Sequence, residues 1–183
     1  MSPARRELTV GEIRDLMTEL GRRLQSKGVE GTLYLVDGAA IALSFDQRRV
    51  TVDVDAAFEP EEPVVGVARE IAEEKGLSAN WLNNSARAFM PGGDTEAVPL
   101  AVPGLTVAVA SPEHLLAMKM AAFRPADMAD LELLFRELGI GKPEEAADIA
   151  LKVYGEDTVV LPGRDDLVLS ARAILERLRR GGH

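Results

Sequence analysis

The chain has 183 residues, of which 46% are hydrophobic and 28% charged, the balance of a globular protein that buries a core. It has no cysteine and only two histidines, His114 and His183, which excludes disulfides, thiolate metal sites and histidine-rich zinc sites. No apolar run approaches the roughly 20 residues of a membrane span, and the first residues lack the apolar core of a signal peptide. We therefore expect a cytoplasmic protein that does not enter a membrane.

The charge is acidic, with a net value of −9. Residues 53–96 contain ten acidic and three basic side chains, whereas a protein that binds a long stretch of nucleic acid is usually basic. The candidates for a local basic patch are Arg5, Arg6, Arg14, Arg22, Arg23 and Lys27 near the N-terminus and Arg172, Arg177, Arg179 and Arg180 near the C-terminus. The charge argues against an extended nucleic-acid interface and leaves recognition of a single end open.

The first elements follow from capping signals and periodicity. Thr9 followed by Glu12 forms a capping box, and apolar residues at helical spacing predict a helix over 10–27 that Gly28 ends. A β-prone run predicts a strand over 32–37, and a short apolar segment predicts a helix over 38–45. A charged turn then leads into a strand over 49–57.

This last strand carries a pair of carboxylates. Its alternation places Thr51, Asp53 and Asp55 on one face and the valines of 50–54 on the other. Two carboxylates this close repel each other unless a cation lies between them. Oxygen-only ligands suit Mg²⁺, which takes one or two protein carboxylates and leaves other positions to substrate phosphates. The alternative is the exposed polar face of an edge strand.

A turn of small residues precedes the acidic strand. Gly38, Ala39 and Ala40 lie at the predicted strand-to-helix junction, where backbone N–H groups at a helix N-terminus favour a phosphate. A phosphate turn on one strand and a metal pair on the next together indicate a nucleotide site.

These motifs resemble the polymerase-β-like nucleotidyltransferases, which carry a Gly-[Gly/Ser] turn followed by Asp-x-[Asp/Glu]. Here the turn is Gly38-Ala39 and the acidic motif is Asp53-Val54-Asp55. The segment Arg49-x-Thr51-x-Asp53-x-Asp55 looks like the branch that includes the AbiEii and MenT toxins. Ala39 departs from that branch, which often has serine there, so one hydroxyl is missing from the phosphate turn.

The middle of the chain predicts a helix from Pro63 to Lys75 and a hairpin of strands 98–102 and 105–109. Between them lies Trp81, which we interpret as a buried anchor, with a place in the lining of the site as the alternative. Neither hairpin strand contains an acidic residue. Polymerases of the superfamily take a third metal-binding carboxylate from such a strand, so the resemblance disfavours a chain-elongating polymerase.

Ser111 and Pro112 start the next helix, in which Lys119 is the only charged residue between Glu113 and Arg124. Two interpretations remain open for this lysine. Its ammonium group reaches solvent along its aliphatic stem, or it points into a cleft and binds a triphosphate.

Pro125 then breaks the helix and places Asp127 and Asp130 in the first turn of the following one, where acidic residues are favoured by the helix dipole. The series Lys119, Arg124, Asp127 and Asp130 also resembles the third and fourth motifs of the AbiEii/MenT-like enzymes. The resemblance implies that Asp127 orients Lys119 or supplies the missing carboxylate near the acceptor. The sequence does not distinguish the role of Asp127 from that of Asp130.

Three further helices are predicted, over 131–138, 143–154 and 165–180. We therefore expect an α/β fold, with a small mixed sheet flanked by helices and a helical C-terminal part. The expected division is a nucleotidyltransferase-like core over 1–125 and a helical extension over 126–183 packed on it as one compact unit.

The resemblance implies an enzyme that moves NMP from an NTP to an acceptor and releases pyrophosphate. Asp53 and Asp55 would hold Mg²⁺, Gly38 and Ala39 would supply backbone donors, Lys119 would bind phosphate oxygens, and Arg49 would support the acidic strand or the nucleotide. In the toxin branch the acceptor can be a tRNA 3′ end, and the partner is then a cognate antitoxin. The alternatives are transfer to a protein or small molecule, a non-catalytic antitoxin or binding module, and a generic α/β domain.

Overall fold

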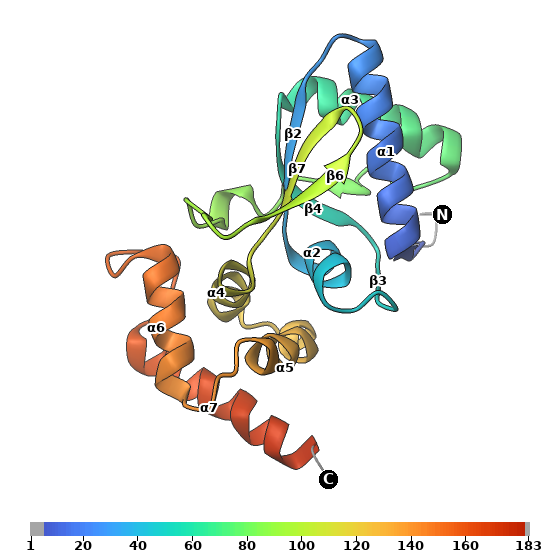
Figure 1. Cartoon of the computed structure of the whole chain (residues 1–183). Coiled ribbons are helices and arrows are strands. Elements are labelled where there is room, and N and C mark those ends of the chain that lie inside the picture. The colour runs from blue at the N-terminus through green and yellow to red at the C-terminus, as the bar shows by residue number, and fades with distance from the viewer. Residues whose placement is uncertain (1–5, 182–183) are drawn as a thin grey trace. The chain divides into compact units, whose positions relative to one another are not determined.

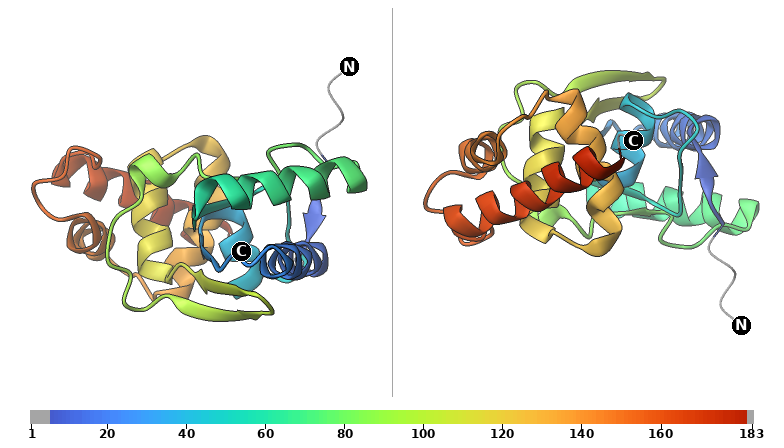
Figure 2. Two further views of the ribbon diagram at one scale, coloured as in Figure 1. Left: turned by 90° about the horizontal axis from the view of Figure 1, so that it is seen from above. Right: turned by 90° about the horizontal axis from the view of Figure 1, so that it is seen from below.

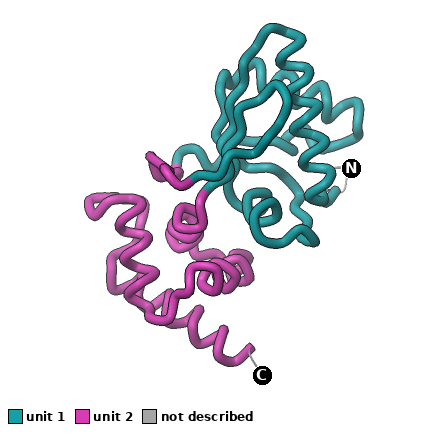
Figure 3. The backbone as a smooth tube through the Cα atoms, viewed as in Figure 1, with its two compact units in different colours: residues 1–88, 97–110 teal, residues 89–96, 111–183 magenta. Residues whose placement is uncertain are grey.

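A computed structural model describes residues 6–181, so Arg5 and His183 lie outside the described residues. The chain forms two compact units (Figure 3). The sheet unit comprises Met1–Ala88 and Ala97–Ala110, and the helical unit comprises Phe89–Glu96 and Ser111–His183. The mixed α/β class predicted from the sequence is confirmed.

The sheet unit alternates strands and helices. Its elements are β1 (Leu8–Thr9), α1 (Val10–Ser26), β2 (Gly31–Leu35), α2 (Asp37–Ser44), β3 (Val50–Thr51), β4 (Val54–Glu59), α3 (Glu61–Lys75), β5 (Leu82–Asn83), β6 (Val98–Val102) and β7 (Leu105–Val109) (Figure 1). A five-stranded sheet has the order β5-β4-β2-β7-β6, and β1 pairs with β3 separately. Strand β2 is antiparallel to β4 and parallel to β7, so the sheet is mixed.

One face of the sheet is covered and the other is open within this unit. Helices α1 and α3 pack against each other; α1 contacts β6 and β7, and α3 contacts β4 and β5. Leu33 and Leu35 of β2 are buried beneath them. The side chains that alternate with these leucines point the other way, and Thr32 and Thr106 are exposed there. A sheet with one buried face and one solvent-exposed face explains why apolar and polar residues alternate along these strands.

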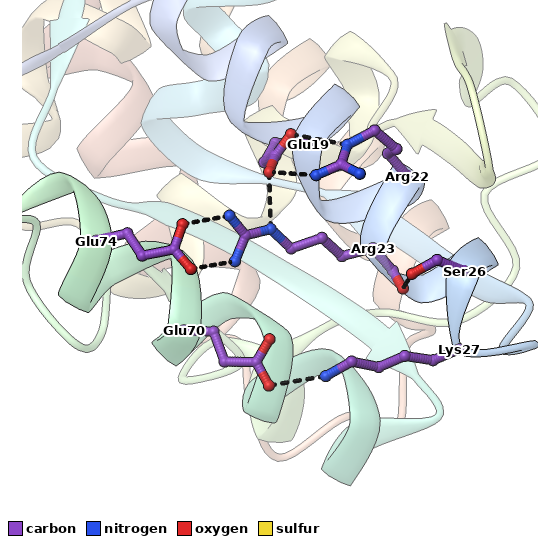
Figure 4. Close-up of polar contacts among 7 residues, drawn as sticks. All are labelled: Glu19, Arg22, Arg23, Ser26, Lys27, Glu70 and Glu74. Atoms are coloured by element: carbon purple, nitrogen blue, oxygen red, sulfur yellow. Dashed lines mark hydrogen bonds and ion pairs between the residues drawn. The ribbon is translucent and has the colours of Figure 1, made fainter.

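Ion pairs join α1 to α3 at the surface (Figure 4). Arg23 pairs with Glu74 of α3 and with Glu19 of its own helix, and Lys27 Nζ lies 2.7 Å from Glu70 Oε1. Hydrogen bonds from Arg22 and then from Arg23 lower the pKa of Glu19 to about 2. These pairs neutralise much of the N-terminal basic patch that the sequence suggested.

The tightest contact in the sheet unit joins α1 to the β6–β7 turn. A Cβ atom on Gly21 would overlap the carbonyl oxygen of Pro103 and come within 3.1 Å of Leu105 Cγ. We expect Gly21→Ala to lower the free energy of unfolding by about 1–3 kcal/mol, because backbone has to move. Gly66 of α3 has open space around it, and Gly66→Ala should be neutral or stabilising by up to ~1 kcal/mol. Urea denaturation of both variants measures the difference, and equal stabilities would contradict this packing.

The helical unit contains α4 (Pro112–Ala122), α5 (Met128–Glu137), α6 (Pro143–Tyr154) and α7 (Arg164–Gly181). Helix α4 packs on α5 and α6, and α7 packs across α5 and α6 (Figure 2). Residues 89–96 belong to this unit as well, and the hydroxyl of Tyr154 donates a 2.6 Å hydrogen bond to the carbonyl of Phe89.

The division into units differs from the predicted one. The expected boundary at residue 125 falls inside the helical unit, which includes all of α4. The physical reason is that the buried side chains of α4 are covered by α5 and α6, so this helix and Lys119 belong with the C-terminal helices. The chain forms two compact units where the sequence predicted one.

Most predicted elements are present, and one is divided. The Thr9–Glu12 capping box, the N-cap at Ser111 and the hairpin of β6 and β7 are confirmed. The strand predicted over 49–57 is two strands, β3 and β4, because they pair with different partners, β1 on one side and β2 with β5 on the other.

Trp81 is the buried anchor that the sequence predicted. Its side chain is 1% exposed, and the indole N–H donates a 2.8 Å hydrogen bond to the carbonyl of Ala68 in α3. Among residues 6–181, no helix is both long and apolar enough to cross a membrane.

Candidate functional site

The predicted site residues lie in both units. Gly38, Ala39, Arg49, Asp53 and Asp55 belong to the sheet unit, and Lys119 and Asp127 belong to the helical unit. Each group forms a local arrangement of its own.

The acidic pair lies at the start of β4. Asp55 is the second residue of the strand and pairs with Asn83 of β5. Asp53 precedes the strand, and its Oδ2 is 3.5 Å from the Asn83 amide nitrogen. Both carboxylates are half-buried. Two carboxylates at the start of β4, with the side-chain amide of Asn83 beside them, form an oxygen-rich set of the kind that Mg²⁺ binds.

A bend in the backbone between β3 and β4 positions Asp53. Thr51 Oγ1 donates a 3.0 Å hydrogen bond to the carbonyl of Asp53, which closes the bend between β3 and β4. The strict alternation predicted across this stretch is therefore wrong at its start: Val50 is 38% exposed, whereas Val54 is fully buried. Asp55 keeps its predicted place on the face opposite Val54.

The turn of small residues predicted to bind phosphate follows β2, next to the strand that carries Asp55. The N–H of Val36, the last residue before α2, donates a 2.9 Å hydrogen bond to the carbonyl of Asp55. A Cβ atom on Gly38 would approach Thr51 Oγ1 to 3.1 Å, so the turn also contacts β3. The sheet thereby joins Val36, two residues before Gly38, to Asp55.

The amino end of α2 has no side-chain cap. Its N-cap, Val36, offers no side-chain hydrogen bond, and the first amides of any helix have no partner within it. Asp37 has a φ of 53°, in the left-handed region that costs energy for residues other than glycine and recurs at functional sites. Ala39 is buried, with 1% of the residue exposed.

Arg49 lies in the turn between α2 and β3. Its side chain is half-buried, and its backbone N–H donates a 3.0 Å hydrogen bond to the carbonyl of Asp46.

The helical unit holds a buried ionic cluster around Lys119. Lys119 Nζ lies 2.9 Å from Asp127 Oδ1 and 2.8 Å from Asp130 Oδ2, and the three side chains are 3–4% exposed. The interpretation in which the ammonium group of Lys119 reaches solvent is therefore wrong. Asp130, whose role the sequence left open, is an equal partner in this cluster.

Arg124 closes the cluster from the outside. Its Nε lies 2.9 Å from Asp127 Oδ2, while its side chain remains 59% exposed. Burial alone would raise the pKa of the Asp127 carboxyl, but the hydrogen bonds from Arg124 and Lys119 outweigh it and lower that pKa. Two cations therefore face two carboxylates, and the one that reaches solvent is Arg124.

A second buried polar group, not predicted from the sequence, lies at the start of α4. Asp94 Oδ2 accepts a 2.8 Å hydrogen bond from the Ser111 N–H, and Asp94 Oδ1 lies 3.4 Å from His114 Nδ1. Ser111 Oγ lies 3.2 Å from the same ring nitrogen. A catalytic triad needs the serine and the aspartate on opposite ring nitrogens, so this group anchors residues 89–96 to α4. The loop proline and glycines beside Asp94 were the only sequence signal.

Comparisons with models of protein families, with curated proteins and with solved structures give no significant match.

Proposed function

We propose that this chain is a Mg²⁺-dependent nucleotidyltransferase, which transfers NMP from an NTP to an acceptor and releases pyrophosphate. The observation that carries the proposal is the hydrogen bond between Val36 and Asp55, which holds the phosphate turn against the acidic pair. The resemblance of the motifs to AbiEii/MenT-like enzymes supports the same activity. The mixed sheet is compatible with the fold of that superfamily.

The donor atoms fit the metal. Asp53 and Asp55 would hold Mg²⁺ through oxygen, with substrate phosphates as further ligands, and the bound ion would offset charge that develops on the transferred phosphate. The backbone N–H groups of Gly38 and Ala39 would donate hydrogen bonds to a phosphate oxygen at the positive end of α2.

The ionic cluster supports a positioning role for Asp127. Because this carboxylate contacts Lys119 and Arg124, the contacts favour orientation of these cations over the role of a third metal ligand. Arg124, which is 59% exposed, is the cation of the cluster that would meet a phosphate from solvent.

The charge bears on the acceptor. Arg22, Arg23 and Lys27 pair with glutamates, and Arg177 lies 2.7 Å from Glu132. These four of the candidate basic residues are therefore paired with carboxylates. A single tRNA 3′ end needs no extended basic surface and still suits this site. The specific proposal is therefore a toxin that acts on tRNA and has a cognate antitoxin as its partner. The same charge favours the second candidate, transfer to a protein or small molecule.

Binding of NTP by calorimetry, with and without Mg²⁺, tests the site. We expect binding that Mg²⁺ strengthens at least tenfold, since the ion screens the triphosphate from two carboxylates. The double variant Asp53→Asn, Asp55→Asn should lose the Mg²⁺ dependence and keep its fold, because both side chains are half-buried at the surface. Binding that does not respond to Mg²⁺ in the unaltered protein would argue against the proposed site.

A further inference from the structure

The open face of the sheet carries a groove that lies along β2, β4 and β7. The groove has a volume of about 280 Å³, and its side chains come from β2, β4, β7 and the 3₁₀ turn at Arg87–Phe89. Residues 55, 57 and 59 of β4 share this face, since the buried residues 54, 56 and 58 point the other way. The floor of the groove at Ala57 therefore starts about 7 Å along the strand from Asp55.

The strand register gives the groove an aromatic floor with small neighbours. Tyr34 of β2 is paired with Ala57 on one side and Ala108 on the other. Tyr34, Ala57 and Ala108 all line the groove. Thr32 and Thr106, which are paired in the next row, extend the floor.

The rim carries one cation and one anion. Arg87 Nη2 lies 2.7 Å from Glu59 Oε1, and the two side chains are 45% and 68% exposed. An apolar floor with a guanidinium donor and a carboxylate acceptor at its edge matches a nucleobase, which presents a π face and an edge with both donors and acceptors.

We propose that this groove binds the base of a nucleotide, stacked on Tyr34 and held at its edge by Arg87 and Glu59. The inference rests on the proposed function, because Asp55 shares the strand face of the groove residues Ala57 and Glu59. The base belongs either to the NTP or to the terminal nucleotide of the acceptor.

Nucleoside monophosphates in EDTA test the groove separately from the metal site. The probes are AMP, CMP, GMP and UMP, titrated into ¹⁵N-labelled protein and followed by the amide resonances. We expect at least one of them to shift the amides of Thr32, Tyr34, Thr106 and Ala108. Shifts confined to other parts of the chain, or no binding of any of the four, would overturn the proposal.

Variants make the test specific. Tyr34→Ala should weaken binding about tenfold or more, the range found for loss of base–aromatic stacking, and Tyr34→Phe, which keeps the ring, should retain it. Arg87→Ala should also weaken binding, whereas Arg69→Ala, which removes an exposed arginine of α3, should not. Equal affinity of Tyr34→Ala and the unaltered protein would overturn the stacking role.

The two proposals fail separately. The double variant Asp53→Asn, Asp55→Asn should bind the monophosphates normally, because no metal takes part. Transfer activity that Tyr34→Ala leaves unchanged would overturn the groove and keep the enzyme. Binding at the groove in a protein without transfer activity would keep the groove and overturn the enzyme. If the protein has transfer activity and the groove binds a base, the KM values of Tyr34→Ala identify the nucleotide. A raised KM for the NTP assigns the base to the donor nucleotide, and a raised KM for the acceptor assigns it to the acceptor.

Discussion

The variant Lys119→Met is expected to lower the free energy of unfolding of the helical unit by about 3–5 kcal/mol. Removal of the ammonium group leaves the carboxylates of Asp127 and Asp130, both about 3–4% exposed, without their shared cation. Chemical denaturation followed by circular dichroism measures the loss.

Two control variants distinguish the loss of a buried cation from the loss of an exposed ion pair. Lys152→Met removes a lysine of the same unit that is 72% exposed in its ion pair with Glu113, and exposed pairs contribute about 1 kcal/mol or less. The triple variant Lys119→Met, Asp127→Asn, Asp130→Asn removes the buried charges together and should recover part of the stability. A loss in Lys119→Met no larger than that in Lys152→Met would contradict the buried cluster.

The cluster also predicts how stability responds to acid. The pKa of Asp127 is lower in the folded protein than in the unfolded chain, so its ionised form favours the fold. This contribution is complete above the pKa of an unfolded aspartate, about 4, and is lost as the pH falls through the lower folded value. In Asp127→Asn this part of the acid dependence should be absent.

The second large effect is expected on catalysis. If the proposed activity holds, replacement of Asp53 or Asp55 by asparagine should lower kcat for nucleotidyl transfer by at least about 10³-fold, because electrostatic stabilisation of the transferred phosphate would depend on the ion that these carboxylates would hold. Asparagine keeps the shape of the side chain and removes the charge. The matched control is Asp46→Asn, in the exposed turn before β3, which should leave the rate unchanged. Equal rates for Asp55→Asn and the unaltered protein would contradict the assignment.

Capping residues and turn residues predicted those helices and strands whose boundaries are set by residues close in the sequence. The hairpin of β6 and β7 follows from its Pro103–Gly104 turn, and α1 follows from its capping box and its apolar spacing. The stretch from Val50 to Asp55 shows the limit of the same reasoning. Its alternation continues across a point where the pairing partner changes from β1 to β2, and only the tertiary arrangement determines that change.

The ionic cluster shows a similar limit at the candidate site. The sequence marks Lys119 as an unusual charge on an apolar helix, but its partners lie beyond the break at Pro125. The turn there brings Asp127 and Asp130 back to the lysine, which helical spacing within α4 does not predict. Asp94 and Ser111 are separated by a complete hairpin, and their contact likewise depends on the fold.

The most direct test of the proposed activity is transfer of radiolabel from each α-labelled NTP, in the presence of Mg²⁺, to total tRNA and separately to total protein. We predict label on one of these acceptors that the double variant Asp53→Asn, Asp55→Asn does not produce. Label on tRNA supports the toxin, and label on protein alone keeps the chemistry with another acceptor. Absence of label from both, in a protein that also fails to bind NTP with Mg²⁺, would contradict the account.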